Sequence, residues 1–344
     1  MDKLVVFNNS DLSRFLNIRP SESKFGEHVN MLPPVCNIYE YIEKLDVNYV
    51  LIGIPENIGV LANFGKQSTI HTWEATLKSL LNIQKNEFTN PENVLILGYL
   101  NFEKELKKIN ELDLSIDKQL DKCRKIVSKI DKEVSNLVYS IKKAGKIPII
   151  VGGGHNNSYG NIKGSALALN SPINVINLDT LTNFKPEEGR HSGNGFTYAY
   201  VEGFLKNYYV FGVHENHIPN SILKEINKLK HISFSSYESI EVKQTTTFKK
   251  ELKQALSCIE ALPFGIEIDC SAIEKLNEDT STTSGFSTKK ARRFVNYFGK
   301  REAVQYLHIC EAAPTKENAL HIGKQISYLI TDFINANSSR KVAE

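Results

Sequence analysis

The chain has 344 residues, 41% hydrophobic and 24% charged, which is typical of a globular protein with a substantial core. Its 42 basic and 39 acidic residues give a net charge of +3, and the lysines are spread along helical segments without interleaved aromatic residues, which disfavours nucleic-acid binding. The apolar runs are far shorter than the roughly 20 residues of a membrane span, and the charged N-terminal segment does not resemble a secretory signal. We therefore expect a cytoplasmic protein with no membrane partner.

Eight short apolar runs rich in β-branched residues alternate with segments of helical period, which is typical of a parallel α/β sheet. Most runs are apolar on both faces, as buried parallel strands must be. The predicted strands are Tyr49–Ile54, Val94–Gly98, Ile147–Val151, Asn174–Leu178, Tyr208–Val213, His231–Ser235, Phe264–Ile268 and Gln305–Ile309. The pattern predicts a three-layer α/β sandwich around a central eight-stranded, mostly parallel sheet.

The clearest predicted helix runs from Leu114 to Ala144, where apolar residues recur every three or four positions and Gly145 supplies the stop. Further helical patterns occupy Ser68–Leu81, Phe248–Ala261, Lys289–Phe298 and Glu317–Ile334. No composition shift divides the chain, so we expect one domain over residues 1–344. Within it, residues 1–45 would wrap the core, and residues 103–145 would form a long helical excursion that begins with a charged surface segment, Glu103–Ser115.

Five scattered cysteines without CxxC spacing indicate neither a disulfide framework nor a thiolate zinc site. Two of them adjoin acidic residues at predicted strand ends, Cys270 after Asp269 and Cys310 before Glu311. Neighbouring side chains of an extended segment point to opposite faces, so both thiols are expected in the core.

Polar residues that can bind metals follow several predicted strands, at the edge where ligands bind in parallel sheets. His155 comes after the glycine run 152–154, Asp179 ends another strand, and Glu267 and Asp269 are two residues apart, so they share a face. Together they form an oxygen-rich set suited to a hard divalent ion such as Mn²⁺. Taken one at a time, such acids more often cap helices, and such a histidine is more often structural.

These motifs resemble those of the arginase (ureohydrolase) superfamily. GGGHNNSYGN is similar to its first signature, DTLTN stands where the family has D-A-H-x-D, EID where it has D-x-D, and HICEAAP resembles its glutamate-containing segment. The resemblance extends through most of the chain, including GIPENIGVLANFGKQST. NFKPEEGRHSGNGF is similar to the substrate loop of the formiminoglutamase branch, with Lys185 where that branch tends to carry arginine.

The resemblance implies an arginase-type fold and two Mn²⁺ ions that activate a bridging hydroxide for hydrolysis of linear amidine or guanidine C–N bonds. The implied ligands are His155, Asp179, Glu267, Asp269 and Asn183. Glu311, facing the amidine, and Asp269 are the implied catalytic residues. However, Leu181 stands where the family has its middle histidine, and a leucine side chain has no lone pair to bind a metal. Asn183 stands where the family has its second loop aspartate, and it offers only a neutral amide oxygen. We therefore expect one divalent ion at most, possibly none, and weak or lost hydrolysis.

Without metal, the remaining carboxylates repel one another, at about 4 kcal/mol for a pair at roughly 4 Å and an effective dielectric near 20. We expect relief through protonation of one acid, through Lys185 or His155 as a counter-charge, or through water.

The resemblance also implies that Lys185, His191, Ser192 and Asn194 bind substrate, although such loops commonly satisfy their own backbone. His214, Glu215 and His217 are either ligand-recognition groups or solvated surface residues. Phe196 stands where arginases place a histidine, and it is equally compatible with ordinary packing.

Two classes of function remain open: a one-metal amidine hydrolase, or a catalytically silent relative that binds a ligand or assembles with partners. The expected ligand is a small amidine or amino-acid-like molecule, and family members commonly form trimers or hexamers, which implies a homo-oligomer.

Overall fold

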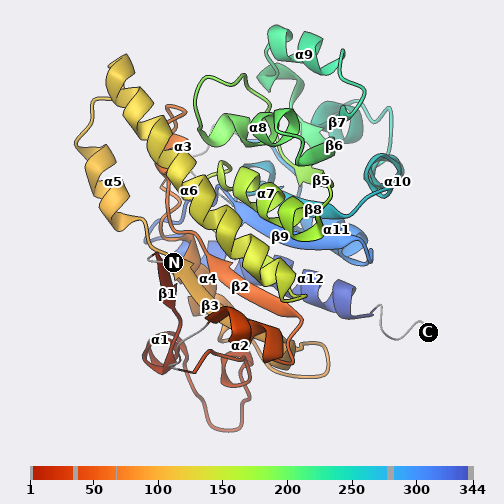
Figure 1. The fold of residues 1–344 in the computed structure, drawn as a ribbon. Helices are drawn as coiled ribbons and strands as arrows, with labels where there is room; N and C mark the ends of the chain where they lie inside the picture. Colours follow the sequence, from red (N-terminus) through yellow and green to blue (C-terminus); the bar gives the residue numbers. More distant parts are fainter. Residues whose placement is uncertain (1–2, 34–37, 67, 277–282, 340–344) are drawn as a thin grey trace.

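A computed structural model describes residues 3–33, 38–66, 68–276 and 283–339. Within these residues nine strands form one sheet in the order β1-β3-β2-β4-β9-β8-β5-β6-β7 (Figure 1). Only β1 is antiparallel to its neighbour in this part of the chain. The strands are β1 (Leu4–Val6), β2 (Tyr49–Gly53), β3 (Val94–Leu100), β4 (Ile147–Val151), β5 (Ile173–Leu178), β6 (Leu205–Val213), β7 (Ile232–Ser236), β8 (Phe264–Asp269) and β9 (Val304–Cys310).

Helices cover both faces of the sheet, so the protein has three layers. One face packs against α1 (Asn9–Phe15), α4 (Thr72–Leu80), α10 (Phe248–Ile259), α11 (Thr288–Gly299) and α12 (Ala319–Ser338). The other lies under α2 (Ile38–Lys44), α3 (Ile58–Leu61), α5 (Glu103–Asn110), α6 (Asp117–Lys143), α7 (Asn157–Leu169), α8 (Gly195–Val201) and α9 (Asn220–Ile226). Side chains alternate along β2, with Leu51 in one core and Val50 and Ile52 in the other. The central strands are therefore buried on both sides, as the uninterrupted apolar runs predict.

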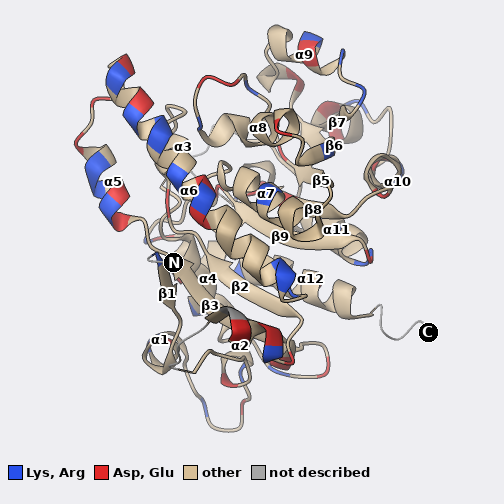
Figure 2. Cartoon of the chain, in the orientation of Figure 1, with Lys and Arg blue, Asp and Glu red and all other residues tan. Residues whose placement is uncertain are grey.

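The long helix α6 buries the predicted apolar stripe, and the chain leaves it through Gly145, which has a φ of +72°. It packs closely on α7 at two glycines. A Cβ at Gly160 would lie 2.7 Å from Val134 Cβ, and one at Gly164 would lie 2.6 Å from the Ser135 carbonyl oxygen. Apart from the buried Asp131, the charged residues of α5 and α6 lie on the outside of this layer (Figure 2).

The three-layer sandwich and all eight predicted strands are confirmed, with bounds that differ by a few residues. The ninth strand, β1, was not predicted, because three residues are too few to show a period. The charged segment Glu103–Ser115 contains the amphipathic helix α5, which packs through the buried Ile109. No helix among the described residues is both long and apolar enough to cross a membrane.

Candidate metal and amidine site

The predicted site residues lie at the carboxyl ends of β4, β9, β8 and β5, which are consecutive in the sheet. His155 follows β4, Glu311 follows β9, Asp269 ends β8 and Asp179 follows β5. His155, Asp179 and Asp269 are buried, and Glu311 is partly buried. Parallel pairing of neighbouring strands thus brings together residues that are far apart in the sequence.

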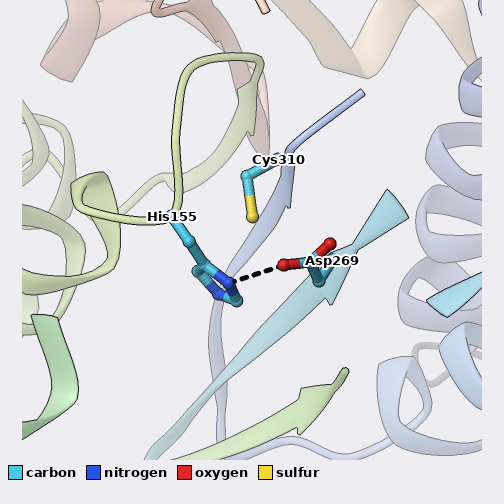
Figure 3. A group of neighbouring side chains, drawn as sticks. All are labelled: His155, Asp269 and Cys310. Carbon is cyan, nitrogen blue, oxygen red and sulfur yellow. Dashed lines mark hydrogen bonds and ion pairs between the residues drawn. The ribbon is translucent and has the colours of Figure 1, made fainter. Parts of the chain in front are cut away.

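His155 lies at the centre of the acidic cluster. Its Nδ1 lies 3.0 Å from Asp269 Oδ2 (Figure 3) and 3.2 Å from Asp179 Oδ2. Burial by itself lowers the pKa of His155, but the neighbouring Cys310 and the two aspartates outweigh burial and raise this pKa well above its ordinary value. His155 is therefore the counter-charge that an acidic pocket without metal requires.

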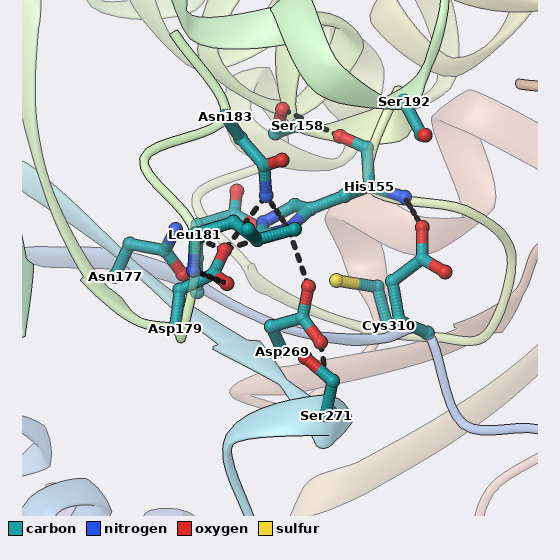
Figure 4. Close-up of polar contacts among 12 residues, drawn as sticks. His155, Ser158, Asn177, Asp179, Leu181, Asn183, Ser192, Asp269, Ser271 and Cys310 are labelled. Carbon is teal, nitrogen blue, oxygen red and sulfur yellow. Dashed lines mark hydrogen bonds and ion pairs between the residues drawn. The ribbon is translucent and has the colours of Figure 1, made fainter. Parts of the chain in front are cut away.

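The Asp179 carboxylate accepts hydrogen bonds from residues of the loop that follows β5 and from Asn177 within β5 (Figure 4). Its Oδ1 accepts from the Leu181 amide at 2.8 Å, and its Oδ2 accepts from Asn177 at 2.9 Å and from Asn183 at 2.7 Å. The amide nitrogen of Asn183 also lies 2.8 Å from His155 Nδ1. Burial, and then repulsion by Asp269, raise the pKa of Asp179 to about 6.

Glu267 is bound by two side chains of the neighbouring strand β9, which the sequence motifs did not identify. Tyr306 donates its hydroxyl to Oε1 at 2.8 Å, and Oε2 makes a short hydrogen bond with His308 Nδ1. Burial raises the pKa of Glu267, but His308 and His155 outweigh burial and bring the pKa to about 2. Glu267 and His308 are register partners in adjacent strands, and a single-sequence motif search cannot detect such a pair.

Glu311 accepts from the backbone amide of His155 at 2.7 Å. Its φ of +57° lies in the left-handed region that non-glycine residues seldom adopt, and such strain is often found at functional sites. Burial, and then the Asp269 carboxylate, raise the pKa of Glu311 to about 8. This carboxyl group therefore takes up a proton readily, and a cationic ligand would favour its charged form.

Glu56, in the segment after β2, joins that segment to the loop after β4. Its fully buried carboxylate accepts from the amides of Ile58 at 2.7 Å and Gly154 at 3.2 Å, and from Asn157 Nδ2 at 2.7 Å. Burial raises the pKa of Glu56 although these bonds oppose the change. No local sequence pattern singles out Glu56, because its hydrogen-bond partners lie about 100 residues away in the chain.

Two predicted substrate residues of the loop after β5, Lys185 and Ser192, meet at Asn63. Lys185 Nζ donates to Asn63 Oδ1 at 2.8 Å, and Asn63 Nδ2 donates to Ser192 Oγ at 3.2 Å. Lys185 is exposed and forms no ion pair with the site acids among the described residues, so His155 rather than Lys185 balances the charge of these acids.

The other two predicted substrate residues, His191 and Asn194, hydrogen-bond within their own loop. His191 Nδ1 accepts from the Gly193 amide at 3.1 Å. Asn194 donates to the Gly189 carbonyl at 2.8 Å and accepts from the His191 amide at 3.1 Å. Burial, and then nearby cations with Arg124 foremost, lower the pKa of His191 to about 3, so this ring is neutral.

Arg190 anchors this loop to the helices beneath it. Its guanidinium contacts Asp131 of α6 through Nε at 2.8 Å and Nη2 at 3.2 Å, and both side chains are almost fully buried. It also donates to the Asn156 carbonyl at 2.9 Å and to Asn194 Oδ1 at 2.5 Å. Arg190 therefore connects the loop to the residue that follows His155.

Among the residues left open by the sequence, Phe196 stacks on Tyr208 with ring centroids 4.2 Å apart and lies edge-on to His155 at 5.2 Å. His214 stacks on Tyr237 at 4.7 Å, beyond β6. Glu215 pairs with the exposed Lys243. Phe196 thus packs directly against the site, while His214 stacks on Tyr237 and Glu215 forms an ion pair with Lys243.

The residues present do not fit a bridged pair of manganese ions. Leu181 is 42% exposed and offers no donor atom, so a second ion would lack its nitrogen ligand. Both carboxylate oxygens of Glu267, which the resemblance places between the two ions, are already bound by Tyr306 and His308.

A three-layer α/β sandwich with buried acids and histidines at the ends of adjacent parallel strands defines a class of proteins that bind ligands or metals at this edge of the sheet. The model of the arginase family matches residues 85–332, which is more than half of the chain. The chain therefore belongs to the arginase family.

Within this family the chain is similar to formimidoylglutamases. It is 25% identical to that of Streptococcus gordonii over 234 residues, or 66% of this chain; the match spans 65% of the relative, just under two thirds. The crystal structure of formimidoylglutamase from Bacillus subtilis superposes with a TM-score of 0.73 at 15% identity, covering 96% of this chain and 99% of that one. Trypanosoma cruzi formiminoglutamase, crystallised with Mn²⁺, superposes with a TM-score of 0.71 at 16% identity. This match covers 93% of this chain and 100% of the Trypanosoma cruzi chain.

Proposed function

We propose that this arginase-family protein binds a small amidine or amino-acid-like ligand at the ends of β4, β9, β8 and β5, and that its hydrolysis of amidine C–N bonds is weak or absent. The proposal depends chiefly on the state of Glu267, whose oxygens bond to Tyr306 and His308. Leu181 supports it independently, because its side chain cannot bind a metal.

The charges of the site suit a ligand with a cationic amidine at one end and a carboxylate at the other. Desolvation and the nearby carboxylate of the buried Asp269 both raise the pKa of the partly buried Glu311, and an amidinium group placed beside the two acids would relieve their repulsion. Lys185 and Ser192, which meet at Asn63, would receive the ligand's carboxylate. Formiminoglutamate has both groups, and relatives of this chain carry the name formimidoylglutamase.

The test combines binding, catalysis and metal content on one preparation. Protein purified from manganese-supplemented medium is expected to hold at most one divalent ion per chain and to release formamide slowly or not at all from formiminoglutamate. The ligand is expected to raise the melting temperature of the wild type and much less that of Glu311→Gln. Two manganese ions per chain with rapid turnover would refute the loss of hydrolysis, and a melting temperature insensitive to every amidine tried would refute the ligand class.

A further inference from the structure

A second cavity lies at the carboxyl ends of β2 and β3, beside the strands that carry the amidine site. Pro55 follows β2 and Tyr99 lies near the end of β3, and residues of β1, α1, α4 and α5 enclose the rest. Its volume of about 340 Å³ lies within the roughly 300–1,000 Å³ of small-molecule pockets, which favour this edge of an α/β sheet. None of its lining residues belongs to the amidine site.

Much of the cavity wall is apolar. Phe7 and Phe15 from the N-terminal segment and Leu77 of α4 belong to the hydrophobic core. Trp73, also of α4, packs against Gly53 of β2 so closely that a Cβ at this glycine would lie 2.4 Å from the indole ring. Because only glycine leaves room for the ring there, the indole keeps a fixed position in the wall.

Two hydrogen-bond donors in the wall have no acceptor among the described residues. The Trp73 side chain is only 6% exposed, yet its Nε1 has no hydrogen-bond partner and is not one of the fully enclosed unpaired atoms, so it opens into the cavity. The hydroxyl of Tyr99 also lacks a hydrogen-bond partner within this part of the chain. Polar groups on buried side chains are normally satisfied, so the indole N–H in particular needs an acceptor from outside the protein.

Acidic groups predominate among the charged residues of the lining. Glu74 is balanced by Arg14, which lies 2.9 Å away. Asp11 and Glu103 form no ion pair among the residues that the structure describes. Burial, and then the carboxylates of Glu103 and Asp11, raise the pKa of Tyr99 against the weaker attraction of Arg14, so both acids lie near the Tyr99 hydroxyl. This part of the cavity is therefore electronegative.

We propose that this cavity is a second binding site, which takes a small organic amine with an oxygen acceptor and an apolar body. The ammonium group lies beside Asp11 and Glu103, the oxygen accepts from Trp73 Nε1, and the apolar body packs against Phe7 and Phe15. The inference goes beyond the proposed function, because the cavity shares no residue with the amidine site.

Each part of this ligand follows from a different feature of the wall. A cation is favoured because two carboxylates without counter-charges can accept charge-assisted hydrogen bonds from it. A carboxylate ligand would be repelled by the same two acids. A ring or alkyl group is favoured over a fully polar molecule, because it removes the apolar wall from water.

Fluorescence provides a direct test, because Trp73 is the only tryptophan of the chain and lies in the wall of this cavity. Two probes that differ only by an amino group, phenylalaninol and 3-phenyl-1-propanol, are titrated separately into the wild-type chain. Phenylalaninol is expected to change the Trp73 emission saturably. It is expected to bind at least roughly tenfold more tightly than 3-phenyl-1-propanol, which is the ratio typical of one charge-assisted hydrogen bond.

The variant Glu103→Gln is expected to weaken phenylalaninol binding at least roughly tenfold and to leave 3-phenyl-1-propanol binding within about twofold. Glu111→Gln is the matched control, because Glu111 is an exposed glutamate at the C-terminal end of α5 that does not line the cavity. Glu311→Gln is expected to leave the Trp73 response unchanged, because Glu311 belongs to the amidine site and not to this cavity.

The wild-type titrations are sufficient to refute the proposal, so the test does not depend on the folding of a variant. Unchanged emission with phenylalaninol, equal affinity for the two probes, or an equal loss of affinity in Glu111→Gln would each overturn it. Loss of the response in Glu311→Gln would assign the amine to the amidine site and would likewise remove the second site.

Discussion

Removing the guanidinium of Arg190 is expected to destabilise the protein strongly, because this group is the only cation that contacts the buried Asp131 within the described residues. Burial already raises the pKa of Asp131 to about 6 against the attraction of Arg190. Arg190→Met would leave that carboxyl group in the core without a counter-charge. It would also remove the anchor between Asn156 and Asn194.

The expected cost is about 3–5 kcal/mol, which is typical when one partner of a buried ion pair is removed. With an unfolding entropy of roughly 2.1 cal/mol/K per residue, a chain of 344 residues has about 0.7 kcal/mol/K, so the melting temperature should fall by roughly 4–7 °C. The double variant with Asp131→Leu removes both charges together. It should recover part of the loss and retain a cost of roughly 1–3 kcal/mol for the missing loop hydrogen bonds.

Thermal melts of the two single variants and the double variant form a double-mutant cycle that measures the coupling. Arg14→Met is the matched control, since Arg14 is paired with Glu74 but its side chain is 64% exposed, and such a pair contributes at most about 1 kcal/mol. Additive losses in the double variant, or an Arg190→Met melting temperature within a degree of wild type, would show that the buried pair does not anchor the loop.

Three further predictions concern acid stability, the lost metal ligands and assembly. The pKa of His191 is lowered to about 3, so the folded state binds fewer protons than the unfolded state between pH 3 and about 6.5, and stability falls as the pH drops through this window. At pH 5 this amounts to about 2 kcal/mol. Urea unfolding at pH 5, 6 and 7 should show a smaller loss in His191→Asn, and an unchanged slope would contradict the assignment. Leu181→His with Asn183→Asp, and then Glu267→Asp, should give a stepwise manganese-dependent rise in melting temperature, approaching about 2.7 kcal/mol of stabilisation at 100 times the dissociation constant; a folded triple variant indifferent to manganese would show that these positions are not a vestigial metal site. Sedimentation at micromolar concentration should show a trimer or hexamer, and a monodisperse monomer would argue against a homo-oligomer.

The sequence alone was sufficient to predict the fold class and the edge of the sheet at which the site lies. The apolar runs of β2, β4, β5, β8 and β9 are legible because burial on both faces requires continuous apolar residues. His155, Asp179 and Asp269 could be predicted as neighbours, because carboxyl ends of parallel strands meet at one edge, whereas Glu311 was predicted only through the resemblance to the arginase superfamily. The inferences about the strands and the first three residues require only local periodicity and the rule of parallel pairing.

Only the tertiary structure decided what each acid contacts. Glu267 looks like a metal ligand in the sequence, but cross-strand register places Tyr306 and His308 on its two oxygens. Cys310 looks like a core residue as long as it is expected to alternate with Glu311, but the left-handed φ of Glu311 turns the glutamate off that alternation, so the Cys310 thiol and the Glu311 carboxyl group both lie toward His155. Register and a single unusual dihedral angle depend on packing across the whole sheet, so neither leaves a local pattern in the sequence.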